Sequence, residues 1–143
     1  MGGKANMSVG SGDKLKMCPK HQADAVLDQN NPVSGTKYVV LDTTKNVRII
    51  GIEVHVTWTG QPTPLECHIT IDGQSYTASF TDPVSNTLYH VGSSGSTSGF
   101  VFSSSDLQNS RAFLLEGRSV KVEVETTGGT VSSLKARVKY AKW

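Results

Sequence analysis

The sequence predicts an all-β fold, an antiparallel β-sandwich of the jelly-roll type with about eight or nine strands. Three observations lead to this prediction. Apolar and polar residues alternate with a period of two from Lys37 almost to the end of the chain. The apolar runs are short and end at Gly, Ser, Asn or Asp, which are typical turn residues. No window between the runs has the period of a helix, so the strands are expected to pair antiparallel.

The chain of 143 residues is long enough for one domain with its own core. We divide it into an extended N-terminal arm, residues 1–36, and a β-sandwich domain, residues 37–143. The arm is rich in Gly, Ser, Asn, Lys and Asp and has few large apolar side chains to offset the entropy cost of ordering it. Pro19 and the residues after it are compatible with one short helix near residues 19–27, with Val26 and Leu27 on the same side.

A long half-buried strand is expected over residues 46–58, NVRIIGIEVHVTW. Its predicted inner face is Ile50, Ile52, Val54, Val56 and Trp58. The run LECHITI, residues 65–71, repeats the alternation and places Cys67 inward and His68 outward. Asp72-Gly73 then favours a type I′ turn, after which QSYTASF should return as an antiparallel partner.

Five further strand-like runs follow, with the sequences TLYHV, GFVFS, AFLLEG, SVKVEVETT and SLKARVKYA. Gly128-Gly129 predicts a hairpin turn between the last two. In that arrangement the acidic outward face of SVKVEVETT would pair with the basic outward face of SLKARVKYA, which is formed by Lys135, Arg137 and Lys139.

The overall charge is weak, because the formal net charge is +2 and 18% of the residues are charged. We therefore expect no nucleic-acid partner. The first residues lack the apolar core of a secretory signal, and no window is long and apolar enough to cross a bilayer. The sequence thus predicts a protein made in the cytoplasm, neither secreted nor membrane-bound.

The four histidines are not accompanied by a recognisable catalytic pattern. No spacing places an acid and a nucleophile around one of them, and neither a nucleophile elbow nor a nucleotide-binding fingerprint is present. We expect a protein that is not an enzyme and that has no cofactor.

A zinc site formed by Cys18, His21 and Cys67 is the one metal arrangement worth weighing. Neighbouring residues on a strand point to opposite faces, so Cys67 and His68 reach one metal only if a bulge intervenes. We expect no metal site, and Cys67 is interpreted as a small buried apolar residue.

The aromatic residues allow two interpretations, a sugar-stacking platform or core packing. Most of them occupy inward strand positions, which favours the core. Trp143 differs because it ends the chain, where an exposed indole is expected to dock against a partner or the body.

One stretch carries a resemblance to a known group of proteins. The run NVRIIGIEVHVTWTGQPTPLECHITIDGQ, followed by paired valine-rich strands, resembles small β-sandwich proteins of tailed bacteriophage particles, such as head decoration (cement) proteins and head-fibre modules. The resemblance covers residues 37–143. It implies a virion structural protein that acts as a homo-oligomer and binds the major capsid protein or other virion subunits.

The residues expected at the partner interface come from the arm, the chain end and two loops. In the arm and at the chain end they are Lys14, Lys16, Pro19, Val26, Leu27 and Trp143. In the proline-stiffened loop and the Gly/Ser-rich loop they are Gln61, Pro62, Thr63, Pro64, Ser94 and Ser96. The alternative is a carbohydrate- or receptor-binding module that uses these loops and nearby aromatic residues.

Overall fold

A computed structural model of the chain describes residues 21–60, 64–81, 83–93, 100–103, 115–128 and 130–142. These residues form ten strands and no helix, so the all-β prediction is confirmed. The strands are β1 (His21–Asn30), β2 (Tyr38–Thr43), β3 (Val47–Thr59), β4 (Leu65–Ile71), β5 (Gln74–Phe80), β6 (Thr87–Ser93), β7 (Phe100–Ser103), β8 (Leu115–Gly117), β9 (Val120–Thr126) and β10 (Thr130–Lys142).

The strands pair as a nested series of antiparallel partners. The innermost pair is β4 with β5, outside it β3 pairs with β6, then β2 with β9, and finally β1 with β10. The innermost turn is the expected one, because Asp72 and Gly73 both have positive φ, 50° and 85°. One long hairpin wrapped in this way gives the jelly roll that the sequence predicts.

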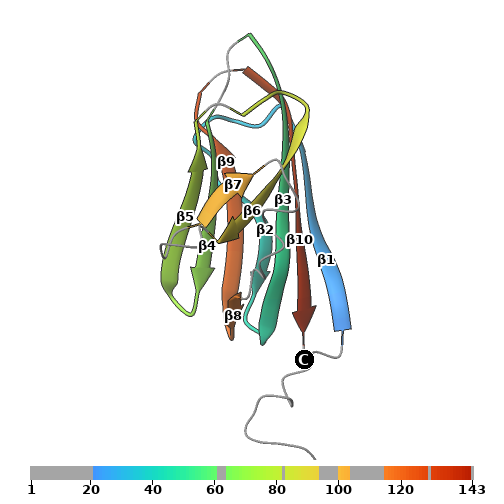
Figure 1. The fold of residues 1–143 in the computed structure, drawn as a ribbon, viewed down its shortest axis with the longest axis vertical. Coiled ribbons are helices and arrows are strands. Elements are labelled where there is room, and N and C mark those ends of the chain that lie inside the picture. The colour runs from blue at the N-terminus through green and yellow to red at the C-terminus, as the bar shows by residue number, and fades with distance from the viewer. Residues whose placement is uncertain are drawn as a thin grey trace, which may run out of the picture.

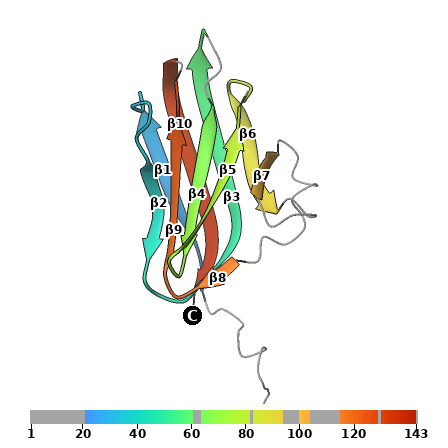
Figure 2. The same cartoon turned by 90° about the vertical axis from the view of Figure 1, so that its left-hand side faces the viewer.

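Two sheets result, and Figures 1 and 2 show them as facing layers. Sheet A has the order β1-β10-β3-β6-β7, with β8 added against β3, and sheet B has the order β2-β9-β4-β5. The inward side chains of both sheets form one apolar core. Its largest fully buried members are Ile49, Ile52, Leu65, Ile69, Leu134 and seven valines.

A β-bulge changes the inner face of β3 at its start. Lys139 lies opposite Gly51 and Tyr140 lies opposite Ile49, so Ile50 is an extra residue on β3. The bulge turns Ile49 into the core and leaves Ile50 43% exposed. The inward assignment of Ile50 was therefore wrong, whereas Ile52, Val54 and Val56 are buried as expected.

The helix expected near residues 19–27 is also wrong, because β1 begins at His21 and pairs with β10 along all of its length. Exposure alternates with period two, and Ala25 and Leu27 pack against the core while Val26 faces outward. After β1 the chain is held to the sandwich by a hydrogen bond from Gly35 N to Thr126 O. Residues 21–36 thus belong to the sandwich, and the boundary expected after residue 36 lies too far along the chain.

The hairpin expected around residues 128–129 is wrong as well. Strand β9 lies in sheet B and β10 lies in sheet A, so this connection passes from one sheet to the other. The acidic and basic faces therefore do not pair. The basic face of β10 instead contacts Glu53 of β3 and Asp24 of β1.

Candidate functional site

An open groove crosses the outer face of sheet A, with a volume of about 410 Å³. Four strands contribute to it, because outward residues of neighbouring strands lie side by side on a sheet face. The apolar, polar and charged side chains that line the groove include Val26, Asp28, His55, Leu88, Lys135 and Arg137. We call this feature the sheet A groove.

Two apolar side chains of the groove are unusually open to solvent. Val26 on β1 is 67% exposed and Leu88 on β6 is 42% exposed. The charged groups of Lys135 and Arg137 on β10 lie between them, because β10 and β3 separate β1 from β6 in sheet A. Apolar residues within a polar surround are typical of a surface that binds another macromolecule.

The polar part of the groove includes the carboxylate of Glu53, whose side chain is only 13% exposed. Arg137 donates to Glu53 Oε1 from Nε and Nη2 at 3.0 and 2.7 Å, and Lys139 Nζ lies 3.3 Å from Oε2. Burial by itself raises the pKa of Glu53, but these hydrogen bonds and charges outweigh it, so the pKa lies below its ordinary value. The same contact raises the pKa of Arg137. The network fixes the side chains under the groove in charged form.

His55 has an unused hydrogen-bonding atom. Its Nε2 lies 3.1 Å from Asn86 Oδ1, whereas its buried Nδ1 has no hydrogen-bond partner. Because a buried polar atom without a partner costs free energy, this atom lowers the stability of the sheet locally.

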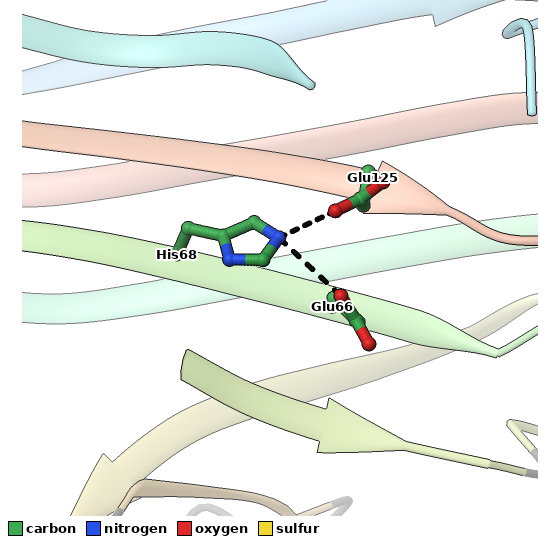
Figure 3. Close-up of side chains that lie close together, drawn as sticks. All are labelled: Glu66, His68 and Glu125. Carbon is green, nitrogen blue, oxygen red and sulfur yellow. Dashed lines mark hydrogen bonds and ion pairs between the residues drawn. The ribbon is translucent and has the colours of Figure 1, made fainter. Parts of the chain in front are cut away.

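A second cluster lies on the outer face of sheet B and is drawn in Figure 3. Glu66 and His68 are two residues apart on β4, so they point the same way, and Glu125 comes from the adjacent strand β9. His68 Nε2 is 2.6 Å from Glu125 Oε1 and 3.4 Å from Glu66 Oε1, and His68 Nδ1 is 3.1 Å from Thr77 Oγ1. We call Glu66, His68 and Glu125 the His68 cluster. Its donor atoms are arranged to share a proton or to hold a cation.

The structure brings few of the sequence-predicted contact residues together. Val26 and Leu27 both line the sheet A groove, and Leu27 also packs against the core. Pro64 is half-buried at the start of β4, where its carbonyl accepts a hydrogen bond from Thr127 N. The other expected contacts lie outside the described residues; they are Lys14, Lys16, Pro19, Trp143, Gln61, Pro62, Thr63, Ser94 and Ser96.

Cys67 and His68 point to opposite faces of sheet B, as the strand alternation predicts. Cys67 is fully buried, and burial raises the pKa of its thiol to about 12. Cys18 lies outside the described residues, and His21 is described only by its backbone in β1. Cys67 is therefore part of the apolar core, as expected.

The aromatic residues whose side chains are described belong to the core. Trp58, Tyr76 and Tyr140 are half-buried against it, and Tyr89 is buried. The Trp58 indole donates to Pro83 O at 3.0 Å, and Tyr89 makes an edge contact with Phe80. Core packing is thus confirmed for these residues.

Sequence reasoning missed the His68 cluster as a unit. The alternation of β4 already placed Glu66 and His68 on one outward face, which was a usable signal. Glu125 carried no such signal in the sequence, because only the pairing of β9 with β4 brings it to His68.

The comparisons with known proteins do not change this description. No protein-family model matches the chain, and no curated protein or solved structure is significantly similar to it. The described part of the chain contains no helix of the length and apolarity that crossing a membrane requires.

Proposed function

We propose that this protein is a structural virion protein, a capsid decoration or cement protein that binds capsid subunits through the sheet A groove and stabilises their lattice. The observation that carries the proposal is the presence of two exposed apolar side chains, Val26 and Leu88, at the two sides of a groove whose middle carries Lys135 and Arg137. A buried apolar contact at the centre of an interface supplies affinity, and the surrounding charges supply specificity.

The fold supports the proposal by analogy only. Jelly rolls are frequent in viral capsid and lectin domains, but a fold by itself does not determine function. A decoration protein requires a rigid body, and the jelly roll provides one because the two sheets interlock through a single apolar core.

The position of β1 favours the sheet A side as the binding side. Strand β1 is the edge strand of sheet A, and its first residue, His21, pairs with Lys142 near the chain end. The start of β1 and the end of β10 therefore lie side by side at one end of sheet A, as Figure 1 shows. The described residues next in sequence to the expected contact segments, His21 and Lys142, thus belong to the groove-bearing sheet. On a lattice, repeated copies multiply a modest affinity at each site.

Co-sedimentation tests the proposal directly. The protein is mixed with undecorated capsids assembled from the major capsid protein of the same genome, and the pellet is assayed for bound protein. Wild type is expected to pellet with the capsids, and Val26→Ser with Leu88→Ser is expected to reduce the bound fraction at least about tenfold, since two apolar contacts are lost. Absence of binding by the wild type rejects the proposal.

Val84→Ser is the matched control for that experiment. Val84 is 62% exposed but does not line the groove. Its substitution should leave the bound fraction unchanged. Equal losses for the control and the groove variant would show that the groove is not the binding surface.

A second candidate is the carbohydrate- or receptor-binding module. The groove volume of about 410 Å³ lies within the range of small-ligand sites. Against it, no Phe, Tyr or Trp of the described residues lines the groove, so it lacks the usual stacking surface for a sugar ring. A glycan array separates the candidates, because capsid decoration needs no sugar binding.

A further inference from the structure

We propose that the His68 cluster is a binding site for a divalent transition-metal ion of the zinc type, held by His68 Nε2, a Glu66 oxygen and a Glu125 oxygen. The inference is independent of the proposed function, because it concerns the outer face of sheet B and is tested on the isolated protein. The three donor atoms lie within 4.8 Å of one another.

The distances are close to those of a metal site. Zinc bound to nitrogen and oxygen at about 2.0–2.2 Å in a tetrahedron places neighbouring donor atoms about 3.4 Å apart. His68 Nε2 and Glu66 Oε1 already have this separation, 3.4 Å. The contact from Nε2 to Glu125 Oε1, 2.6 Å, is a hydrogen bond and must lengthen. A rotation of the Glu125 side chain provides this, because its terminal carboxylate torsion is soft.

The charges also favour a divalent cation. Both carboxylates of the cluster form their ion pairs with the same imidazole. One imidazole carries at most one positive charge against two negative ones, whereas a divalent ion with a neutral imidazole balances both. The Glu125 side chain is only 9% exposed, so its charge gains little from solvent and more from a bound cation.

Thr77 orients the imidazole for metal binding. Thr77 Oγ1 lies 3.1 Å from His68 Nδ1 across the β4–β5 pair. When this hydroxyl accepts the Nδ1 proton, the lone pair of the neutral ring is on Nε2, facing the two carboxylates. A hydrogen bond of this kind fixes the tautomer and orientation of a metal-binding histidine.

The donor types select the metal. One imidazole nitrogen and two carboxylate oxygens suit Zn²⁺ and its neighbours, whereas Ca²⁺ and Mg²⁺ prefer oxygen donors alone. Three protein donors leave a coordination position open, and the 33% exposed Glu66 side chain puts that position on the solvent side.

Calorimetric titration of the full chain with ZnCl₂ tests the proposal. We expect one ion bound per chain, a rise in Tm with Zn²⁺ and little response to Ca²⁺ or Mg²⁺. His68→Gln and Glu125→Gln should abolish this binding, and Thr77→Val should weaken it about tenfold. Glu66→Gln, at the most exposed position, tests the site even if the other variants fail to fold.

Glu123→Gln is the matched control. Glu123 is on β9, lies opposite His68 in the pairing, and has its ion pair with Lys121. Its substitution should change the affinity for Zn²⁺ much less than Glu125→Gln does. Equal losses for both variants would indicate a diffuse charge effect and would overturn the site.

Cobalt substitution distinguishes this site from one that uses cysteine. Co²⁺ in the His68 cluster should give visible d–d bands without a thiolate-to-metal charge-transfer band. The proposal is overturned by such a band, by Zn²⁺ binding that persists unchanged in His68→Gln, or by the absence of binding in the wild type.

Discussion

The carboxylate of Glu53 connects three strands of sheet A at the scale of single residues. It lies on β3, receives two hydrogen bonds from Arg137 of β10 and has the His90 Nδ1 of β6 at 4.0 Å. Arg137 extends the network to Asp24 of β1 at 3.8 Å. The network crosses the outer face on which the groove lies, so its loss affects both stability and the groove.

Glu53→Gln should lower the free energy of unfolding at neutral pH by about 1–3 kcal/mol, because hydrogen bonds to a charged group are lost. The pKa of Glu53 is lower in the folded chain than its ordinary value of 4.5. Its stabilising effect is therefore present above that ordinary value and is lost as the pH falls through the folded-state pKa. Urea unfolding at several pH values should show a smaller acid-induced loss for the variant than for wild type. Parallel pH profiles would contradict this role of Glu53.

Cys67 should be unreactive in the folded protein. Its thiol is fully buried and its pKa is raised by burial to about 12, so almost no thiolate is present at neutral pH. Iodoacetamide treatment followed by peptide mass spectrometry should show Cys67 labelled only after unfolding. The same peptide in denaturant is the control, and rapid labelling of Cys67 in the native protein would contradict the core assignment.

At the scale of elements, β8 approaches sheet B closely at Gly117. A Cβ added there would lie 2.6 Å from Ile71 Cγ2, whereas a Cβ added at Gly51 of β3 meets nothing within 4 Å. Gly117→Ala should therefore cost about 1–3 kcal/mol of stability through overpacking. Gly51→Ala, the matched control, should change it by less than about 0.5 kcal/mol. Chemical denaturation measures both, and equal effects would show that the close approach is not important.

The secondary structure of β1 could not be predicted from its local sequence alone. Ala23, Val26 and Leu27 fit a helical spacing, whereas Ala23, Ala25 and Leu27 fit a strand. Pairing with β10 decides between them, because it supplies backbone partners and covers Ala25 and Leu27.

Removal of residues 1–30 should therefore destabilise the fold, whereas removal of residues 1–20 leaves the β1–β10 pairing complete. We expect the longer truncation to lower stability by about 2–4 kcal/mol, through lost burial and pairing. It should also promote aggregation, because β10 becomes an uncovered edge. Thermal unfolding and light scattering compare the two truncations. Equal Tm values would mean that β1 is not part of the stable sandwich.

At the scale of the whole molecule, β10 connects β1 to β3 within sheet A. Strand β10 lies between β1 and β3 in sheet A, and its Leu134 and Val138 are fully buried. A chain that ends at residue 129 should therefore show no cooperative unfolding transition by circular dichroism. The truncation of residues 1–20 removes more residues but none of the described strands, so it serves as the control. A cooperative transition in the shortened chain would contradict this role of β10.

Local patterns predicted correctly the features that depend only on the alternation of side chains along one strand or on the residues of one turn. The alternation in β4, with Cys67 inward and His68 outward, and the turn at Asp72-Gly73 are as the sequence predicts. The bulge at Ile50 was not predicted, because it depends on how β3 is matched to β10. Glu66 and His68 of the His68 cluster, and Val26, Leu27, Lys135 and Arg137 of the sheet A groove, were accessible to sequence reasoning. Glu125 was not, because only strand pairing brings it to His68.

The sequence by itself determined that this chain forms strands, where most of them begin and end, and which side of each strand is apolar. These properties depend on neighbours along the chain, through the two-residue period and the turn residues. Only the tertiary structure decided which strands are partners, that β9 and β10 lie in different sheets, and that Glu125 meets His68. Those outcomes depend on residues distant in sequence competing for the same hydrogen bonds and the same core, and no local pattern encodes the result of that competition.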